Sequence, residues 1–171
     1  MLTYKKLDRK DVSEELFEQI MAVENSTGSG YEEDIMREIW LTRDNNDNFV
    51  CMDEDKIVAH ISYNPKSKRR NGSIYMVNLT VLPEERRRGI AQNLIYTATK
   101  YYVDNGYTLL MSLNVDKDNI PAVNLYQKVG FEIKEPICEA DEDDEQYIMD
   151  SSLQNIKLTL EEIFKQNIKT K

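Results

Sequence analysis

Three arginines and a glycine occupy consecutive positions in the middle of the chain, within the run Arg86-Arg87-Arg88-Gly89-Ile90-Ala91. A strand-like segment ends at Pro83 just before this run, and a helix-like segment begins within it. The first N–H groups of a helix lack partners inside the helix, and the helix dipole favours an anion beside them. Arginine adds charge-assisted hydrogen bonds to phosphate, and Gly89 lets the backbone approach a bulky ligand. The run therefore predicts an anion site suited to a pyrophosphate.

The better-known phosphate-binding motifs do not occur in this sequence. No GxxxxGK run is present, and Gly28-Ser29-Gly30 fails the GxGxxG pattern because Glu33 stands where the third glycine belongs. The three arginines could also mark the solvated start of an ordinary helix or a general basic patch. Both interpretations stay open on these residues alone.

A second patterned run lies further along the chain and reads Asn119-x-x-Ala122-x-x-Leu125-Tyr126-x-x-x-Gly130-Phe131. The first run, written Arg86-x-x-Gly89-x-Ala91, resembles the Q/R-x-x-G-x-G/A signature of the GNAT superfamily of acyl-CoA-dependent N-acyltransferases. The second run is similar to the second signature of that family. One predicted helix and one predicted strand separate the two, as is usual in the family, and the resemblance extends from about residue 73 to 131.

The resemblance implies an α/β fold with a single mixed central sheet flanked by helices. It implies one N-acetyltransferase domain over residues 1–171, with a cofactor-binding core at about 73–131 and an extra C-terminal helix at about 152–168. The strands 73–82 and 107–115 would run parallel and separate, so that the acyl-pantetheine fills the gap. The residues that would bind acetyl-CoA are Leu79, Thr80, Val81, Arg86, Arg87, Arg88, Gly89, Ile90, Ala91, Asn119 and Tyr126.

The activity that the resemblance implies is transfer of an acetyl group from acetyl-CoA to a primary amine by direct attack in a ternary complex. Binding both reactants side by side removes much of the entropic barrier. The Leu79 N–H would donate to the thioester carbonyl oxygen, and Tyr126 would protonate the departing thiolate. A tyrosine pKa of about 10 keeps that proton available at neutral pH. Apart from the motif, Tyr126 could equally be a packed core aromatic residue.

The general base departs from the family pattern. Many members carry a glutamate on the strand before the pyrophosphate loop, and Tyr75 occupies that position here. An ordered water chain, Glu32 or Glu33 could take the proton instead. His60 is a further candidate because its unperturbed pKa is near neutrality, although an ordinary structural histidine also fits its place on a strand.

The acceptor is indicated by charge. Six acids fall within the seven residues 139–145, among them Glu142 and Asp143 as candidate substrate contacts. The family topology would place this hairpin loop near the acceptor entrance, where it would attract cationic amines such as polyamines, lysine side chains or aminoglycosides. A solvated loop is the alternative. Tyr31 and Trp40 either line the acceptor pocket or belong to the core.

The elements that must position these residues follow from hydrophobic spacing and turn residues. Strands are expected at 3–7, 49–52, 56–63, 73–82, 107–115, 131–137 and 145–150. Helices are expected from Asp11 or Ser13 to 24 and at 31–43, 88–105 and 121–129. Thr159 and Glu162 form a capping-box pattern for a terminal helix. Leu160, Ile163 and Phe164 form an apolar stripe on that helix. This stripe would pack on its own domain or form a homodimer contact.

Composition excludes several other functions. The net charge of −9, from 22 basic and 31 acidic residues, argues against a non-specific nucleic-acid binder. Two cysteines and one histidine cannot form a disulfide framework, a cysteine-rich zinc site or a multi-histidine metal site. No signal-peptide core or membrane-spanning run is found, so we expect a cytoplasmic protein. A non-catalytic acyl-CoA sensor and a protein N-terminal or lysine acetyltransferase remain alternatives.

Overall fold

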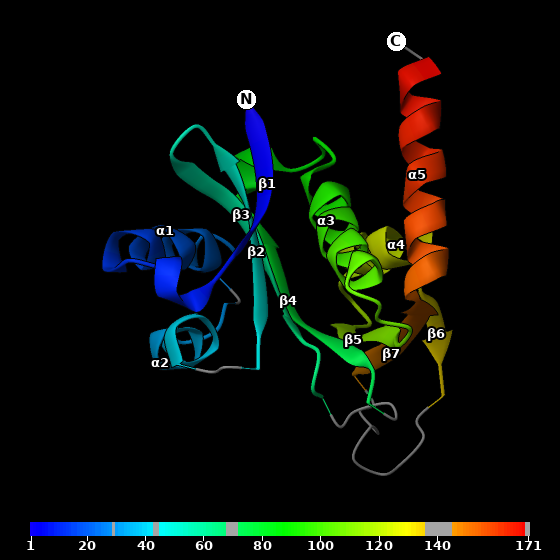
Figure 1. Ribbon diagram of the computed structural model, residues 1–171, viewed down its shortest axis with the longest axis horizontal. Coiled ribbons are helices and arrows are strands. Elements are labelled where there is room, and N and C mark those ends of the chain that lie inside the picture. The colour runs from blue at the N-terminus through cyan, green and yellow to red at the C-terminus, as the bar shows by residue number, and fades with distance from the viewer. Residues whose placement is uncertain (29, 43–44, 68–71, 136–144, 170–171) are drawn as a thin grey trace. The chain divides into compact units, whose positions relative to one another are not determined.

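The structure, a computed structural model, describes residues 1–171 except 29, 43–44, 68–71, 136–144 and 170–171. Seven strands join in one mixed sheet with the order β1-β2-β3-β4-β5-β7-β6 (Figure 1). The strands are β1 (Leu2–Leu7), β2 (Asp47–Asp53), β3 (Lys56–Asn64), β4 (Ile74–Val81), β5 (Leu110–Asp116), β6 (Glu132–Lys134) and β7 (Gln146–Ser152). The helices are α1 (Glu14–Asn25), α2 (Glu33–Arg37), α3 (Ile90–Asp104), α4 (Ile120–Lys128) and α5 (Leu153–Lys169). The expected α/β fold with a C-terminal helix is confirmed.

The chain divides into two compact units, which are described separately. Unit 1 comprises Met1–Pro65 and Val77–Ala98, and unit 2 comprises Lys66–Met76 and Thr99–Lys171. Strand β4 and helix α3 each contribute residues to both units. No helix in the described ranges is both long and apolar enough to cross a membrane.

Unit 1 is built on three antiparallel strands and two helices. Strand β2 pairs with β1 on one side and with β3 on the other. Helix α1 begins where the Ser13 hydroxyl accepts the Leu16 N–H at 3.2 Å, as the sequence predicts. Its apolar face is buried through Phe17, Ile20 and Val23, and α1 contacts β3. Figure 1 shows α1 and α2 beside these strands.

The second predicted helix of unit 1 is interrupted. Helix α2 is followed by a π-helical turn at Glu38–Thr42, in which the Thr42 hydroxyl donates to the Arg37 carbonyl at 3.1 Å. The wider turn belongs to a segment that buries Ile39 and Trp40 completely. Trp40 is therefore a core residue, which removes it from the candidates for the acceptor pocket.

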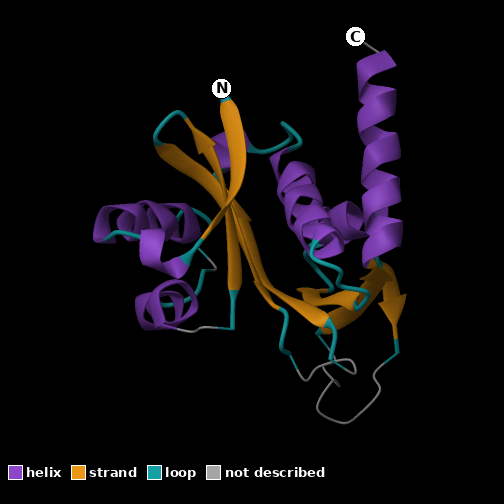
Figure 2. Cartoon of the chain, in the orientation of Figure 1, coloured by secondary structure: helices purple, strands orange, loops and turns teal. Residues whose placement is uncertain are grey.

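Unit 2 contains the parallel pairing that the resemblance implies. At the start of β4, Ile74 pairs with Met111 of β5 and Tyr75 pairs with Ser112. Strand β7 pairs antiparallel with β5 and with β6, and α5 continues directly from β7 (Figure 2). The β4–β5 pairing confirms the expected direction of these two strands.

The predicted start of β5 at Tyr107 was wrong. The Gly106 N–H donates to Val103 and the Tyr107 N–H donates to Tyr102, which closes α3 in a Schellman motif. Gly106 adopts the required positive φ of 78°. Tyr107 is thereby part of the helix cap, and the strand begins only at Leu110.

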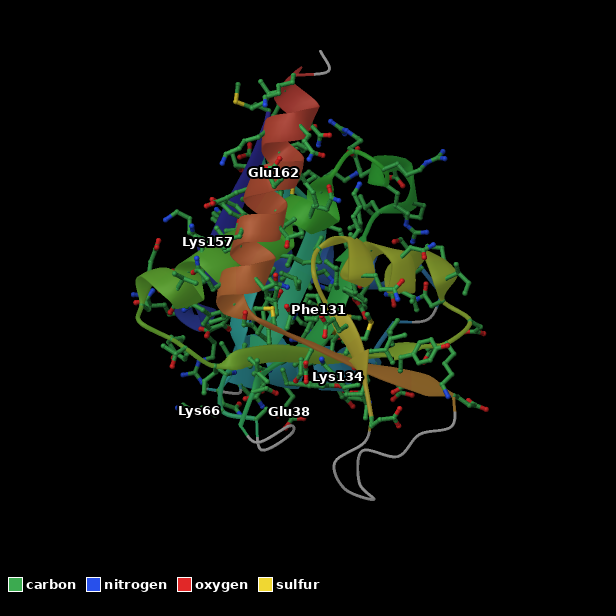
Figure 3. All side chains as sticks on the ribbon, turned by 90° about the vertical axis from the view of Figure 1, so that its right-hand side faces the viewer. Glu38, Lys66, Phe131, Lys134, Lys157 and Glu162 are labelled. Carbon is green, nitrogen blue, oxygen red and sulfur yellow. The ribbon has the colours of Figure 1, made fainter. Side chains whose placement is uncertain are left out.

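The predicted capping box of the terminal helix was also wrong. Helix α5 begins at Leu153, and the Ser152 hydroxyl accepts the Asn155 N–H at 3.1 Å. Thr159 lies well inside the helix, facing the Gly130 turn. Leu153, Ile156 and Leu160 are buried. Of the expected stripe, Leu160 is buried, whereas Ile163 and Phe164 are half-buried. Figure 3 shows Lys157 and Glu162 on α5.

Candidate active site

The loop that joins β4 to α3 lies in unit 1 and has two residues in the left-handed region. Arg87 has φ 62° and Gly89 has φ 79°, immediately before α3 begins at Ile90. Turns of this kind arrange successive N–H groups into a concavity that binds anions. The positive φ at Arg87 costs a non-glycine residue roughly 1–2 kcal/mol. A Cβ added at Gly89 would come no closer than 3.7 Å to Asn93, so its φ, not crowding, requires glycine there.

The three arginines of this loop are exposed and differ in their contacts. Arg86 donates its backbone N–H to the Pro83 carbonyl at 3.3 Å and its side-chain Nε to the Val81 carbonyl at 3.2 Å. Arg88 forms an ion pair with Glu85. The Arg86 N–H is therefore already engaged, and the N–H groups that can meet an anion follow it along the loop.

The β4 residues that precede the loop alternate in direction. Leu79 and Val81 are half-buried, whereas Thr80 is buried and donates its hydroxyl to Glu24 Oε2 at 2.8 Å. Asn78 Nδ2, on the same face, is 3.4 Å from that oxygen. The Thr80 side chain is thus engaged by α1.

Glu24 is the functional candidate that sequence reasoning missed. Its side chain is buried, with Oε2 3.0 Å from His60 Nε2 and Oε1 accepting the Tyr31 N–H at 3.0 Å. Burial raises the pKa of Glu24, but His60, the Tyr31 N–H and the Thr80 hydroxyl together outweigh burial and lower it. The carboxylate is therefore ionised at neutral pH.

The other candidates for the base, and Tyr31 from the expected acceptor pocket, have different surroundings. His60 is fully buried, and its ring meets Trp40 edge-on with the centroids 5.5 Å apart. Glu32 and Glu33 are exposed, and Glu33 accepts a bond from Arg37 at 2.9 Å. Tyr31 is 40% exposed and donates its hydroxyl to the Val77 carbonyl at 3.2 Å. His60 therefore contacts Glu24, and Tyr31 contacts both Glu24 and β4.

In unit 2, Tyr126 is buried on α4, where Asn119 caps the helix by accepting the Ala122 N–H at 3.3 Å. Burial raises the pKa of Tyr126, and the nearby Tyr75 raises it further. A phenol in this setting keeps its proton and can act as an acid but not as a base. Asn119 is exposed, and its cap explains why an asparagine opens the second motif.

The end of the second motif is a helix cap that holds Tyr126. The Gly130 N–H donates to Gln127 at 3.1 Å and the Phe131 N–H donates to the Tyr126 carbonyl at 2.9 Å, which is a Schellman motif. The Tyr126 and Phe131 rings meet edge-on with the centroids 5.8 Å apart. Helix α5 supports the turn, because Asn155 Nδ2 donates to the Gly130 carbonyl at 3.0 Å. Gly130-Phe131 thus fixes the position of the Tyr126 ring.

We predict that Gly130→Ala lowers the free energy of unfolding by about 3 kcal/mol. Gly130 has φ 103°, and an added Cβ would lie 2.9 Å from Asn155 Nδ2. Gly106→Ala is the matched control, because φ there is 78° and nothing lies within 4 Å. Its expected cost is about 1 kcal/mol, from the backbone alone. Urea denaturation of both variants measures the difference, and equal losses would contradict the packing of α5 on this turn.

Two predicted substrate contacts, Glu142 and Asp143, lie outside the residues that the structure describes. Within the described part of the chain, no group of three or more histidine, cysteine, aspartate or glutamate side chains could hold a metal ion.

The class of protein follows from comparison with known families. The acetyltransferase (GNAT) family matches residues 13–131, and the chain belongs to this family. A mycothiol acetyltransferase from Arthrobacter sp. (strain FB24) is 38% identical over 60 residues, which is 35% of this chain. That match spans only 18% of the length of the Arthrobacter protein.

Solved structures with low sequence identity share the fold. The ribosomal-protein-S18-alanine N-acetyltransferase from Escherichia coli superposes with a TM-score of 0.71 at 18% identity, over 90% of this chain and 94% of that one. Arabidopsis thaliana NAA60, solved in complex with acetyl-CoA, gives a TM-score of 0.70 at 15% identity, over 90% and 99% of the two chains.

Proposed function

We propose that this protein transfers an acetyl group from acetyl-CoA to a primary amine by direct attack in a ternary complex. The observation that carries the proposal is the loop before α3, where two left-handed residues and three exposed arginines precede a helix N-terminus. This set of donors suits a pyrophosphate. Membership of the GNAT family and the acetyl-CoA complex of Arabidopsis NAA60 support acetyl-CoA as the ligand that carries it.

Unit 1 would bind the cofactor through main-chain groups. The loop N–H groups from Arg87 to Ala91 would hold the pyrophosphate, with the guanidinium groups adding charge-assisted bonds. The main chains of Leu79, Thr80 and Val81 would bind the pantetheine arm, and the Leu79 N–H would stabilise the negative charge that develops on the thioester oxygen.

The family resemblance implies Tyr126 as the acid. The Tyr126 phenol would give its proton to the sulfur as the carbon–sulfur bond breaks. Its buried position holds the phenol protonated, and the Gly130-Phe131 cap orients it. Asn119, on the first turn of the same helix, would contact the cofactor as the family resemblance implies.

We propose a cationic amine as the acceptor on the basis of charge. The chain carries a net charge of −9, and its densest acidic run is at 139–145. A field of this sign raises the local concentration of cations and speeds their binding. A small polyamine or aminoglycoside, a lysine side chain and a protein N-terminus all satisfy this requirement.

A non-catalytic sensor is the second candidate, and Tyr75 favours it. A tyrosine, with an unperturbed pKa of about 10, is a poor substitute for a glutamate as a base at neutral pH. Under the sensor function the protein would bind acetyl-CoA without turnover.

The two functions are separated by measuring CoA thiol release from acetyl-CoA against spermidine, lysine, aminoglycosides and short peptides. We expect amine-dependent release with at least one cationic class, above a blank without amine. Acetyl-CoA binding measured by calorimetry, together with no release across the panel, would favour the sensor.

A further inference from the structure

A buried carboxylate next to β4 has no role in the function proposed above. Glu24 is 3% exposed, at the C-terminal end of α1. Burying an ionised carboxylate is costly unless charged and hydrogen-bonded partners compensate. An apolar side chain at this position would pack without that cost. A buried charge with a specific partner, placed beside a candidate site, is therefore itself a candidate for function.

We propose that Glu24, paired with His60, accepts the proton that the amine loses during acetyl transfer, and that the Thr80 hydroxyl relays this proton to it. The inference rests on the proposed function, since it supplies the base which that function lacks. All three side chains belong to unit 1.

The contacts describe the last part of a proton path. Thr80 follows Leu79 directly, so their Cα atoms are about 3.8 Å apart, and the Leu79 N–H is the proposed donor to the thioester. The Thr80 hydroxyl donates to Glu24 Oε2 at 2.8 Å. A hydroxyl can accept one proton while it releases its own. Thr80 is thus suited to pass a proton from the reacting nitrogen to Glu24.

The surroundings of Glu24 hold it in one orientation. The Tyr31 N–H occupies Oε1, whereas Thr80, Asn78 and His60 surround Oε2. An added Cβ at Gly30 would lie 2.6 Å from Glu24 Cγ, so glycine is required for the chain to pass over this carboxylate. His60 Nε2 lies 3.0 Å from Oε2 and helps to hold that oxygen in place.

The free amine nitrogen forms a bond to the thioester carbonyl carbon, and the carbon–sulfur bond breaks with its electron pair going to sulfur. The sulfur takes the Tyr126 proton. The nitrogen loses one proton to Thr80 Oγ1 while the proton of Thr80 moves to Glu24. Glu24 then releases a proton to solvent, and the Tyr126 phenolate regains one.

The test compares two nucleophiles, namely the alkylamine that the wild-type protein acetylates best in the panel and hydrazine. Hydrazine is much less basic, so its adduct gives its proton to water readily and depends less on a base. We expect Glu24→Gln and Thr80→Val to lower kcat/KM for the alkylamine by about 10²-fold, and to affect hydrazine far less. Thr80→Ser, which restores the hydroxyl, is expected to recover most of the rate that Thr80→Val loses.

The control is Glu18→Gln, an exposed acid on the same helix, which removes the same charge. Thermal melting checks that each variant folds, and if Glu24→Gln does not fold, the two Thr80 variants decide. Equal losses with both nucleophiles would overturn the inference and assign a structural role to the cluster, as would unchanged activity in Thr80→Val. If the wild-type protein transfers the acetyl group to neither nucleophile, the proposed function itself is contradicted.

Discussion

Replacing Tyr126 with phenylalanine is expected to lower kcat by about 10²-fold or more while leaving acetyl-CoA binding nearly unchanged. The substitution removes the phenolic proton and keeps the ring. Burial raises the pKa of Tyr126 above its usual value, so the wild-type phenol is protonated throughout the neutral range. The edge-on contact with Phe131 does not require the hydroxyl, so the variant should fold.

The measurement is steady-state kinetics with acetyl-CoA and the acceptor found in the panel, together with calorimetry of acetyl-CoA binding. Tyr107→Phe is the matched control, because that tyrosine lies in the same unit and is 37% exposed. Full activity of Tyr126→Phe would show that Tyr126 is only a core residue. A parallel loss of binding and kcat would assign it to cofactor binding instead of proton transfer.

Gly89→Ala is expected to weaken acetyl-CoA binding by about tenfold. A Cβ at φ 79° costs roughly 1–2 kcal/mol, and the loop can avoid this cost by leaving the left-handed region. That movement would turn the N–H groups away from the pyrophosphate. Because the change acts on the cofactor, the dissociation constant and the KM for acetyl-CoA should rise together while kcat changes little.

The control for this variant is Gly28→Ala, which imposes a similar strain at φ 69° in a turn after α1 with nothing within 4 Å. Both variants should lose a similar free energy of unfolding, and only Gly89→Ala should bind acetyl-CoA more weakly. Equal affinities in the two variants would contradict the assignment of the loop before α3 as the pyrophosphate site.

The loop before α3, the candidate pyrophosphate site, could be predicted as a loop from the sequence because its determinants are local. A strand ending at Pro83, a glycine at 89 and the helix after it are contiguous, and helix termini bind anions by virtue of their own backbone. The cap that holds Tyr126 is equally local, since Gly130 and Phe131 close the helix that carries it. The structure begins α3 at Ile90 and closes α4 at Gly130-Phe131, close to where the spacing placed these elements.

The Glu24 cluster could not be predicted in the same way, because its members are distant in sequence. Glu24 meets Thr80 across a separation of 56 residues and comes close to His60 on another strand. One signal was available. Glu24 follows Ile20 by four positions and so continues the buried stripe of α1, where a charged residue is unexpected.

The boundary errors have local physical causes. Tyrosine is common in strands, but the backbone hydrogen bonds that close α3 include Tyr107. Thr159 and Glu162 have the spacing of a capping box, but Ser152 supplies an earlier cap, so the helix extends through both. In each case the hydrogen bonds that cap a helix outweighed the pattern in the sequence.

The most direct test of the central claim is transfer of a labelled acetyl group. The wild-type protein would be incubated with carbon-13 acetyl-CoA and spermidine, lysine, an aminoglycoside or a short peptide, and the amines examined by mass spectrometry. We predict that the label appears in an amide of one cationic amine, and that it is nearly absent with Tyr126→Phe. If none of the amines carries the label although the protein binds acetyl-CoA and does not consume it, the assignment of this protein as an N-acetyltransferase is contradicted.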